Sequence, residues 1–321
     1  MNDENKMITF GPVPSRRLGK SIGINNIPPK ICTYSCVYCQ LGRTIKLQIE
    51  RKPFYNPETI LKAVKEKIQK AKENKEPIDY LTFVPDGEPT LDINIGKEID
   101  LLRELGYKIA VITNGSLIGD SDVQKSLAKA NWVSLKVDAV DEETWYKVNR
   151  GHRKLKFQEI LDGMMEFSKL FQGDLTTETM LIQGINDQPE KVEKDADFIA
   201  QLSPKISYIS IPTRPPAEDW VKPASEFGIN SAYQIFKKKN IDVEYLIGYE
   251  GNAFAYTGDA EKDLLSITSV HPMRREGVNN LLKKAGKDWD IVEKLVQKNK
   301  LIRIKYENNE YYMRKLPNKR S

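Results

Sequence analysis

The sequence predicts an α/β fold built around a parallel β-sheet. Segments with helical spacing of apolar residues alternate with short extended segments through most of the 321-residue chain. Repeated strand–helix units of this kind favour a parallel sheet with right-handed crossovers. The composition, 40% hydrophobic and 30% charged residues, is that of a globular protein, and the length suits one α/β barrel domain.

Each expected element follows from a local pattern. In the helix expected over residues 57–75, Ile60, Val64 and Ile68 recur at helical spacing, Asn56 can cap the helix, and Pro57 suits its first position. The other expected helices cover residues 93–106, 122–130, 142–148, 157–171, 188–202 and 224–239. The expected strands cover residues 21–27, 79–84, 107–113, 132–139, 175–183, 206–212 and 242–248. Functional motifs should directly follow the strands, because ligands gather at the carboxyl ends of a parallel sheet.

A different pattern begins near residue 264. Two helices are expected over residues 273–286 and 288–300, followed by a hairpin that turns at Asn308-Asn309. This order predicts a winged-helix module of roughly 55 residues. Its lysines and basic wing favour an anionic partner such as RNA, with Tyr311 and Tyr312 adding base stacking. The alternative is a dimerisation or capping module with a lysine-rich exterior.

Charge and hydropathy indicate the compartment. The formal net charge of +5 permits an RNA partner, although a solvated lysine-rich surface has the same balance. No stretch is long and apolar enough to span a bilayer, and the first residues contain no apolar signal core. We expect a cytoplasmic protein with no membrane partner.

All three cysteines of the chain, Cys32, Cys36 and Cys39, lie within eight residues. An odd number argues against a disulfide framework, and clustered thiols in a reducing compartment more often bind a metal or take part in chemistry. Structural zinc needs a fourth ligand, and His152 and His271 lie far away in the sequence. Inert core thiols and an iron–sulfur cluster are the other interpretations. A cluster held by three thiolates leaves one iron open, which is typical of catalysis.

The spacing Cys-x3-Cys-x2-Cys, with the aromatic Tyr38 before the last cysteine, resembles the signature of the radical SAM enzymes. The wider stretch of residues 11–44 resembles a subgroup of Fe–S oxidoreductases related to tRNA wyosine-base enzymes such as 4-demethylwyosine synthase. The resemblance covers about residues 11–258. It implies that Cys32, Cys36 and Cys39 hold a [4Fe–4S] cluster whose open iron is chelated by S-adenosylmethionine (SAM).

The resemblance also implies the reaction and the fold. An external one-electron donor, such as flavodoxin or ferredoxin, would reduce the cluster, and cleavage of SAM would yield a 5′-deoxyadenosyl radical that abstracts hydrogen from a substrate. The family fold is a partial (β/α)6 barrel. We therefore expect residues 1–30 to form an N-terminal extension and first strand packing on the barrel, residues 31–260 the barrel, and residues 264–321 the winged-helix-like domain.

Two motifs behind strands extend the resemblance. The sequence PDGEPTL resembles the family's Gly-Gly-Glu-Pro motif, in which Glu88 would accept hydrogen bonds from the SAM ammonium and Gly87 would permit close approach of the backbone. Asp86 departs from that motif, where glycine is usual. After the next strand, Thr113 and Asn114 are expected to reach the ribose or carboxylate of SAM.

Further cofactor contacts are expected from the strand at residues 132–139 and from the cysteine loop. Period-two spacing directs Ser134 and Lys136 to the barrel interior, where a polar pair contacts SAM in related enzymes. An internal ion pair between Lys136 and Asp138 is the alternative. Tyr38 and Gln40, on either side of Cys39, would meet the adenine end of SAM.

Basic residues near the expected cavity are candidates for substrate binding. Arg214 follows a strand and could bind an anionic group, or form a surface salt bridge. The resemblance places Arg16 and Arg17 near the mouth of the site. The loop with Arg150, His152 and Arg153 could meet a substrate phosphate, or simply be solvated; the expected substrate is RNA, in particular tRNA.

Two alternatives stand beside this function. One is a radical SAM enzyme that modifies a protein or peptide, and the other is an iron–sulfur-sensing regulator that binds nucleic acid. Glu88 and the polar residues at strand ends favour an enzyme, because a sensor does not need them. Wyosine synthesis itself is not expected, because wyosine synthases of this relationship carry extra cysteines for a second cluster.

Overall fold

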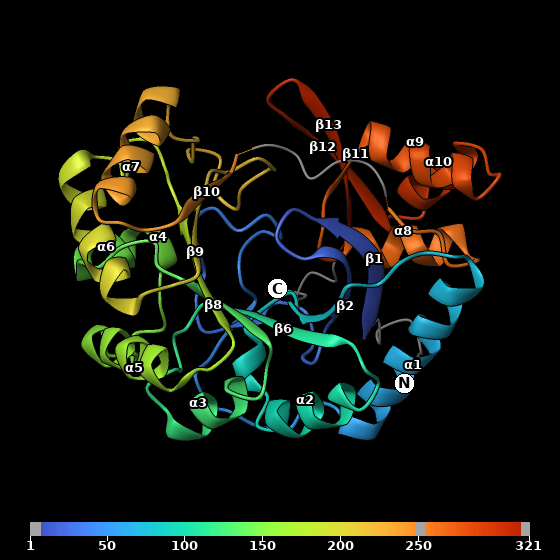
Figure 1. The fold of residues 1–321 in the computed structure, drawn as a ribbon. Coiled ribbons are helices and arrows are strands. Elements are labelled where there is room, and N and C mark those ends of the chain that lie inside the picture. The colour runs from blue at the N-terminus through green and yellow to red at the C-terminus, as the bar shows by residue number, and fades with distance from the viewer. Residues whose placement is uncertain (1–7, 248–253, 316–321) are drawn as a thin grey trace.

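The computed structural model describes residues 8–247 and 254–315, and its centre is one curved eight-stranded sheet (Figure 1). The strand order is β1-β2-β5-β6-β7-β8-β9-β10. All neighbours from β2 to β10 pair in parallel, and only β1 is antiparallel to its neighbour β2. The strands are β1 (Thr9–Ser15), β2 (Gly19–Ile24), β5 (Tyr80–Phe83), β6 (Lys108–Thr113), β7 (Trp132–Lys136), β8 (Asp174–Met180), β9 (Ile206–Ser210) and β10 (Val243–Leu246).

Helices cover the outer, convex face of this sheet, as Figure 1 shows. They are α1 (Pro57–Glu73), α2 (Ile95–Arg103), α3 (Ser121–Leu127), α4 (Glu142–Asn149), α5 (Phe157–Leu170), α6 (Pro189–Leu202) and α7 (Glu226–Lys238). Their apolar faces and the outward side chains of the strands form one continuous core. Local signals define the helix ends, as in α1, where the Asn56 side chain accepts a hydrogen bond from the Glu58 amide at 3.0 Å.

The predicted α/β fold and its partial barrel are confirmed. Each predicted strand and helix of the barrel is present, with ends shifted by a few residues, although residue 248 of the last predicted strand lies outside the described residues. The sequence pattern does not predict β1, the short parallel pair β3 (Ile31–Cys32) and β4 (Lys46–Leu47), or the 3-10 turn Pro89–Leu91. These elements are too short or too irregular to show a clear period.

The strand β1 closes one edge of the barrel and joins it to the C-terminal elements. The Phe10 ring contacts Gly23 of β2, where a Cβ atom would come within 1.9 Å of the ring. Phe10 and Val13 belong to a second apolar cluster, together with Phe254 and residues of the C-terminal helices. The N-terminal edge of the sheet and the C-terminal elements therefore share one core.

The C-terminal elements form a small unit with its own sheet. They are α8 (Ala260–Thr268), β11 (Met273–Arg274), α9 (Arg275–Lys284), α10 (Asp290–Gln297), β12 (Leu301–Tyr306) and β13 (Asn309–Arg314). The three strands pair in the order β11-β13-β12. The sequence pattern does not predict α8 or β11. The hairpin turns at Glu307-Asn308, one residue earlier than predicted, and Glu307 adopts a φ of 47° there.

The prediction that Tyr311 and Tyr312 stack on bases is wrong. Both side chains are buried in the C-terminal unit. The Tyr311 hydroxyl donates to the Thr213 carbonyl at 2.8 Å, and the Tyr312 hydroxyl donates to Glu310 at 2.9 Å. Adjacent side chains of a strand point to opposite faces, so an uncovered strand would expose at least one of the two rings. Here the C-terminal unit and the barrel cover both faces of β13.

Over residues 8–247 and 254–315, we find no helix with the length and apolar character needed to cross a bilayer.

Two neighbouring buried acids predict a pH-dependent stability. Glu98 of α2 and Asp92 are fully buried and adjacent, and burial together with the Asp92 charge raises the pKa of Glu98 to about 9. Between about pH 4.5 and 9, the native state then holds a proton that the unfolded state releases, so stability falls as pH rises through this window. Glu98→Gln should flatten this slope by up to about 1.4 kcal/mol per pH unit.

The slope is measured from urea unfolding between pH 5.5 and 9. Glu104→Gln, at the exposed end of the same helix, is the matched control and should keep the wild-type slope. Equal slopes in Glu98→Gln and the wild type would show that Glu98 is ionised in the native state.

Candidate active site

A cavity of about 390 Å³ opens at the carboxyl ends of the parallel strands. Its walls come from the loops after β2, β5, β6 and β9 and from the ends of β7 and β8. All but one of the predicted site residues line it: Cys32, Cys36, Cys39, Tyr38, Gln40, Gly87, Glu88, Thr113, Asn114, Lys136, Arg214, Arg16 and Arg17. The fold thus brings together residues that are up to 198 positions apart. Most of them follow or end parallel strands of one sheet, whereas Arg16 and Arg17 come from the turn between β1 and β2, at the opposite end of the strands.

The three cysteines have free thiols that are half-buried in the cavity wall. The Cys32 Sγ accepts long hydrogen bonds from the Tyr34 amide at 3.5 Å and the Asn114 side chain at 3.6 Å. The Cys36 Sγ accepts one from the Asn149 side chain at 3.5 Å. Such donors stabilise thiolate sulfur. The three thiols line one cavity. Among residues 8–247 and 254–315, however, no three cysteine, histidine, aspartate or glutamate side chains are close enough together to hold a metal ion as they stand.

The thiols are protonated in the absence of a metal. Burial, followed by the charge of Asp138, raises the pKa of Cys36 to about 12. Burial also raises the pKa of Cys32 and of Cys39. A metal bound here would therefore release protons as it binds, and its affinity would fall at low pH.

Glu88 is a buried carboxylate with neutral partners. Its Oε1 accepts hydrogen bonds from the Thr90 amide, the Thr90 hydroxyl and the Thr113 hydroxyl at 3.0, 2.6 and 2.6 Å, and its Oε2 accepts from the Asn114 amide at 2.8 Å. Burial raises its pKa, while these bonds act in the opposite direction. No basic side chain of the described residues pairs with it, so the cavity contains a fixed acceptor suited to a cationic ligand group.

The loop before Glu88 is fastened to the cysteine loop. The backbone of Gly87 bridges to Ile31, and a Cβ at Gly87, whose φ is 152°, would lie only 1.9 Å from the Ile31 carbonyl oxygen. Asp86, which departs from the glycine of the family motif, forms an ion pair with Lys30 at 3.4 Å, and both side chains are buried. The Lys30 amide also donates to the Asp86 carbonyl at 2.7 Å. The absence of a side chain at Gly87 and the ion pair between Asp86 and Lys30 thus hold the two loops together.

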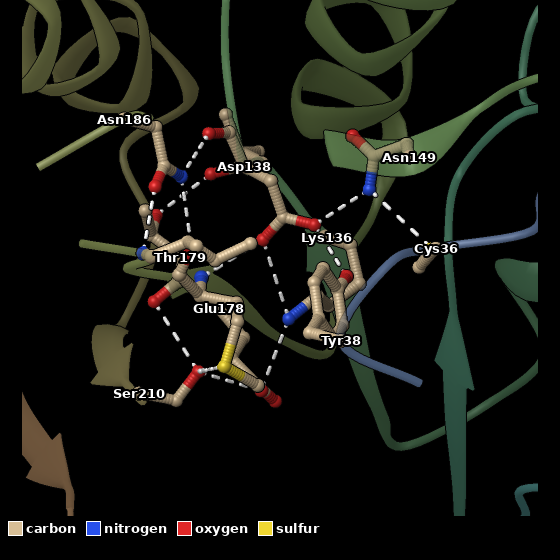
Figure 2. Close-up of polar contacts among 12 residues, drawn as sticks. Cys36, Tyr38, Lys136, Asp138, Asn149, Glu178, Thr179, Asn186 and Ser210 are labelled. Carbon is tan, nitrogen blue, oxygen red and sulfur yellow. Dashed lines mark hydrogen bonds and ion pairs between the residues drawn. The ribbon is translucent and has the colours of Figure 1, made fainter. Parts of the chain in front are cut away.

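A cluster of charges fills the barrel below the thiols. Arg17, from the β1–β2 turn, reaches Glu178 of β8 at 2.5 Å, and Lys136 of β7 lies 3.1 Å from the other oxygen of Glu178. The Ser210 hydroxyl donates to Glu178 at 3.0 Å (Figure 2). Burial alone would raise the pKa of Glu178, but Lys136 and Arg17 outweigh it and lower the pKa to about 2. Glu178 is therefore ionised at any physiological pH.

Asp138 connects this cluster to the cysteine loop, as Figure 2 shows. It accepts hydrogen bonds from the Tyr38 hydroxyl, from Asn149 Nδ2 at 2.7 Å and from the Met180 amide at 2.8 Å. Lys136 lies 3.4 Å from it and also 5.0 Å from the centre of the Tyr38 ring. The ion pair between Lys136 and Asp138, the alternative that the sequence left open, is thus present.

Arg214 and Gln40 lie at the border between barrel and C-terminal unit. Arg214 is buried and donates to the Gln40 side chain at 2.8 Å, and its other terminal nitrogen lies 2.9 Å from His271 Nε2. Gln40 donates in turn to the Val270 carbonyl at 3.1 Å. Arg214 is therefore a buried residue and does not form a salt bridge on the surface. It connects the loop after β9 to the cysteine loop and to the C-terminal unit, and it also lines the cavity.

Some site features differ from the sequence prediction. Ser134 lies two residues before Lys136 on β7. It is buried inside the barrel and does not line the cavity. Arg17 enters the barrel instead of standing at its mouth, with its guanidinium over the rings of Trp132 and Tyr208. Sequence reasoning missed Lys30 and Asn149, because no local pattern links them to the thiols.

Three cysteines in one loop at the carboxyl ends of a partial barrel indicate an enzyme that carries an iron–sulfur cluster. The chain belongs to the radical SAM superfamily, whose family model matches residues 26–199. The cofactors of this superfamily are a [4Fe–4S] cluster and S-adenosylmethionine. The three thiols and the buried, cation-free Glu88 in one cavity fit such a pair of cofactors.

Known proteins place the chain more narrowly. It is 48% identical over 312 residues to the UPF0026 protein MJ1312 of Methanocaldococcus jannaschii, with 96% of each chain covered. It is 26% identical over 204 residues to the probable dual-specificity RNA methyltransferase RlmN of Thermotoga petrophila, covering 61% of this chain and 56% of that protein. Among solved structures, TYW1 with a bound lysine-pyruvate adduct aligns with a TM-score of 0.53 at 18% identity, over 69% of this chain and 75% of that one. The last likeness shows the shared fold.

The buried charge cluster predicts a large effect of a single neutral substitution. Glu178→Gln leaves Arg17 and Lys136 facing each other in the barrel with one carboxylate fewer, and it should lower the free energy of unfolding by about 3–5 kcal/mol. Because the low pKa of Glu178 stabilises the native state only above about pH 4.5, the wild type should lose this contribution as pH falls from 4.5 towards 2.

Urea unfolding of Glu178→Gln, Arg17→Met and the double variant isolates the pairwise energy. The double variant should be less destabilised than the sum of the single variants. Strict additivity would contradict a direct stabilising interaction between Arg17 and Glu178.

Proposed function

We propose that this radical SAM enzyme modifies RNA, with tRNA as the first candidate, and that Cys32, Cys36 and Cys39 hold its [4Fe–4S] cluster. The observation that carries the site assignment is that the three thiols and the fixed carboxylate of Glu88 face one cavity at the carboxyl end of the barrel. When bound, the reduced cluster and SAM supply a carbon-centred radical that removes a hydrogen atom from the substrate. The other residues of the cavity would bind and orient SAM and enclose the site.

In this proposal Glu88 accepts the ammonium group of SAM, since it already has an acceptor oxygen fixed by the Asn114 amide. Thr113 and Asn114 act chiefly by holding Glu88, and Asn114 also supports Cys32. Lys136 and Tyr38 contribute a positive charge and an aromatic face to the cavity wall. Gly87 permits the loop packing that places Glu88, and Gln40 contributes a wall between the cavity and the C-terminal unit.

The C-terminal unit is proposed to be a winged helix. Its elements follow the order helix, strand, helix, helix, strand, strand, from α8 to β13, with β13 between β11 and β12. This is the arrangement expected for a winged helix, with β12 and β13 as the wing. We assign it residues from α8 onward, with β1 supplying part of its core.

An RNA substrate is supported by unneutralised charge on this unit. Several exposed lysines have no carboxylate within 4.0 Å among the described residues, so they can contact phosphates: Lys283, Lys287, Lys294, Lys298 and Lys305. The likeness to an RNA methyltransferase points to the same class of substrate. A protein or peptide substrate is the second candidate, because a winged helix can also dock proteins. We also propose a reducing, cytoplasmic location, which the free cysteines support. The proposed electron donor is a flavodoxin or ferredoxin.

The proposed cofactor residues predict two separable defects. Cys36→Ala should lower bound iron and abolish 5′-deoxyadenosine formation after anaerobic reconstitution with SAM and dithionite. Glu88→Gln should keep its iron but weaken SAM binding about 10- to 100-fold, since one charge-assisted hydrogen bond is lost. Iron content, SAM binding by equilibrium dialysis and 5′-deoxyadenosine by chromatography are the measurements.

Glu50→Gln, at an exposed glutamate that does not line the cavity, is the matched control for Glu88→Gln and should bind SAM within about threefold of the wild type. Full iron content in the wild type without any SAM cleavage would refute the assignment of the site.

The RNA proposal predicts a salt-dependent affinity. Binding of the full chain to bulk tRNA should weaken linearly on a log–log plot against salt, with a slope proportional to the number of neutralised phosphates. Lys294→Gln combined with Lys298→Gln should reduce the slope by about two. Glu261→Gln and Glu276→Gln, exposed acids of α8 and α9, form a control that should not reduce it. A slope near zero for the wild type would argue for the protein or peptide substrate.

A further inference from the structure

A second hollow, of about 810 Å³, lies on the outer side of the cysteine loop. Its lining includes apolar, aromatic and basic side chains, namely Leu47, Tyr146, Lys147, Arg150, Arg153 and Trp220. They come from the segments after β2, β7 and β9, so the hollow opens on the same rim of the barrel as the main cavity. We call it the rim groove.

Two exposed aromatic side chains lie in the rim groove. The Tyr146 side chain is 55% exposed and the Trp220 side chain is 49% exposed, which places both among the few large hydrophobic side chains that face solvent over the described residues. Leu47 adds a further exposed apolar surface at 39%. An aromatic face left open in this way can stack on any nucleic-acid base.

The charge of the rim groove is positive. Its lining contains Lys147, Arg150 and Arg153 and no acidic residue. Lys147 pairs with exposed Glu143, and Arg150 shares the single carboxylate of Glu218 with Arg43. Within the described residues, Arg153 has no carboxylate within 4.0 Å. Positive charge therefore exceeds its local compensation.

One thin layer separates the rim groove from the main cavity. The side chains of Val37, Val148, Ile182 and Val221 form a small apolar cluster, with Tyr38 and Met180 on the cavity side and Ile185 on the groove side. The cysteine loop pairs directly with the end of α4 through the Val37 amide and the Val148 carbonyl at 2.9 Å. A ligand in the groove would lie next to the loop that carries the thiols.

We propose that the rim groove binds a single-stranded segment of RNA that adjoins the nucleotide entering the main cavity. This inference rests on the proposed RNA substrate and names where that substrate lies. Bases would stack on Tyr146 and Trp220, while Arg150 and Arg153 contact phosphates. The combination of open aromatic faces with excess cations matches single-stranded nucleic acid better than an acidic peptide, which offers charge without flat rings.

The test uses the full-length, cluster-loaded protein and a fluorescein-labelled ten-nucleotide RNA of mixed, unstructured sequence. Trp220→Ala should weaken its binding, measured by fluorescence anisotropy, by about 5- to 100-fold, as expected for loss of one stacked base. Arg153→Gln should weaken binding and make it less sensitive to salt. Both residues are exposed, so neither substitution should disturb the fold or iron content.

Matched controls lie elsewhere on the barrel. Phe227→Ala removes an aromatic side chain that is 81% exposed on α7, and Arg103→Gln removes an exposed arginine of α2. Both should bind the RNA as the wild type does. Iron content and uncoupled SAM cleavage should be equal in all variants, because none of these residues lines the main cavity.

The outcomes separate the two proposals. If the wild type binds the RNA and the groove variants bind it equally well, the groove proposal is wrong while the RNA substrate stands. If the wild type binds no RNA but cleaves SAM, the RNA substrate fails and the groove proposal with it. Competition by polyglutamate as effective as that by unlabelled RNA would assign the groove to an acidic peptide, and competition by a mononucleotide at equal concentration would assign it to a free nucleotide.

Discussion

The organisation of the cavity depends on the hydrogen bonds and the ion pair of one buried carboxylate, that of Asp138. Its side chain is entirely inaccessible, so it must be hydrogen-bonded and paired or destabilise the fold. The groups that satisfy it are the Tyr38 hydroxyl, the Asn149 amide, the Met180 backbone and the Lys136 ammonium. They come from the cysteine loop, α4, β8 and β7. Closing the barrel therefore also fixes the cysteine loop, and Asn149 extends the same network to the Cys36 sulfur.

A second set of contacts holds the cysteine loop from the opposite side. Gln40 bonds to the C-terminal unit directly and to Arg214 of the loop after β9, which in turn lies against His271. Tyr306 and Tyr311 of the hairpin donate to the carbonyls of Pro212 and Thr213 in that loop. Displacement of the C-terminal unit would have to break these bonds or move the cysteine loop with it. The unit that carries the exposed lysines is thus mechanically linked to the thiols.

The sequence predicts those parts of the molecule that local patterns encode. The strands and helices of the barrel have clear periods, and Cys-x3-Cys-x2-Cys is a motif of eight residues, so both could be found without tertiary information. Arg17 shows the limit: the family resemblance places it near the mouth of the site, yet the turn between β1 and β2 lies at the opposite end of the barrel, and the side chain pairs with Glu178, 161 positions away. Tyr311 and Tyr312 fail for the same reason, since β13 is central in a sheet whose third strand, β11, is only two residues long.

The size of the main cavity limits what an RNA substrate can do there. At about 390 Å³ it lies at the lower end of small-molecule sites, and SAM must share it. Under the proposed function, a folded RNA would be too large for this volume, so a single nucleotide would have to leave its stack, at a cost of a few kcal/mol, to approach the thiols. Such a cost has to be offset by contacts to its neighbours outside the cavity. Open aromatic faces and cations on the adjoining rim, at Tyr146, Trp220 and Arg153, are where those contacts can form without any rearrangement of the barrel.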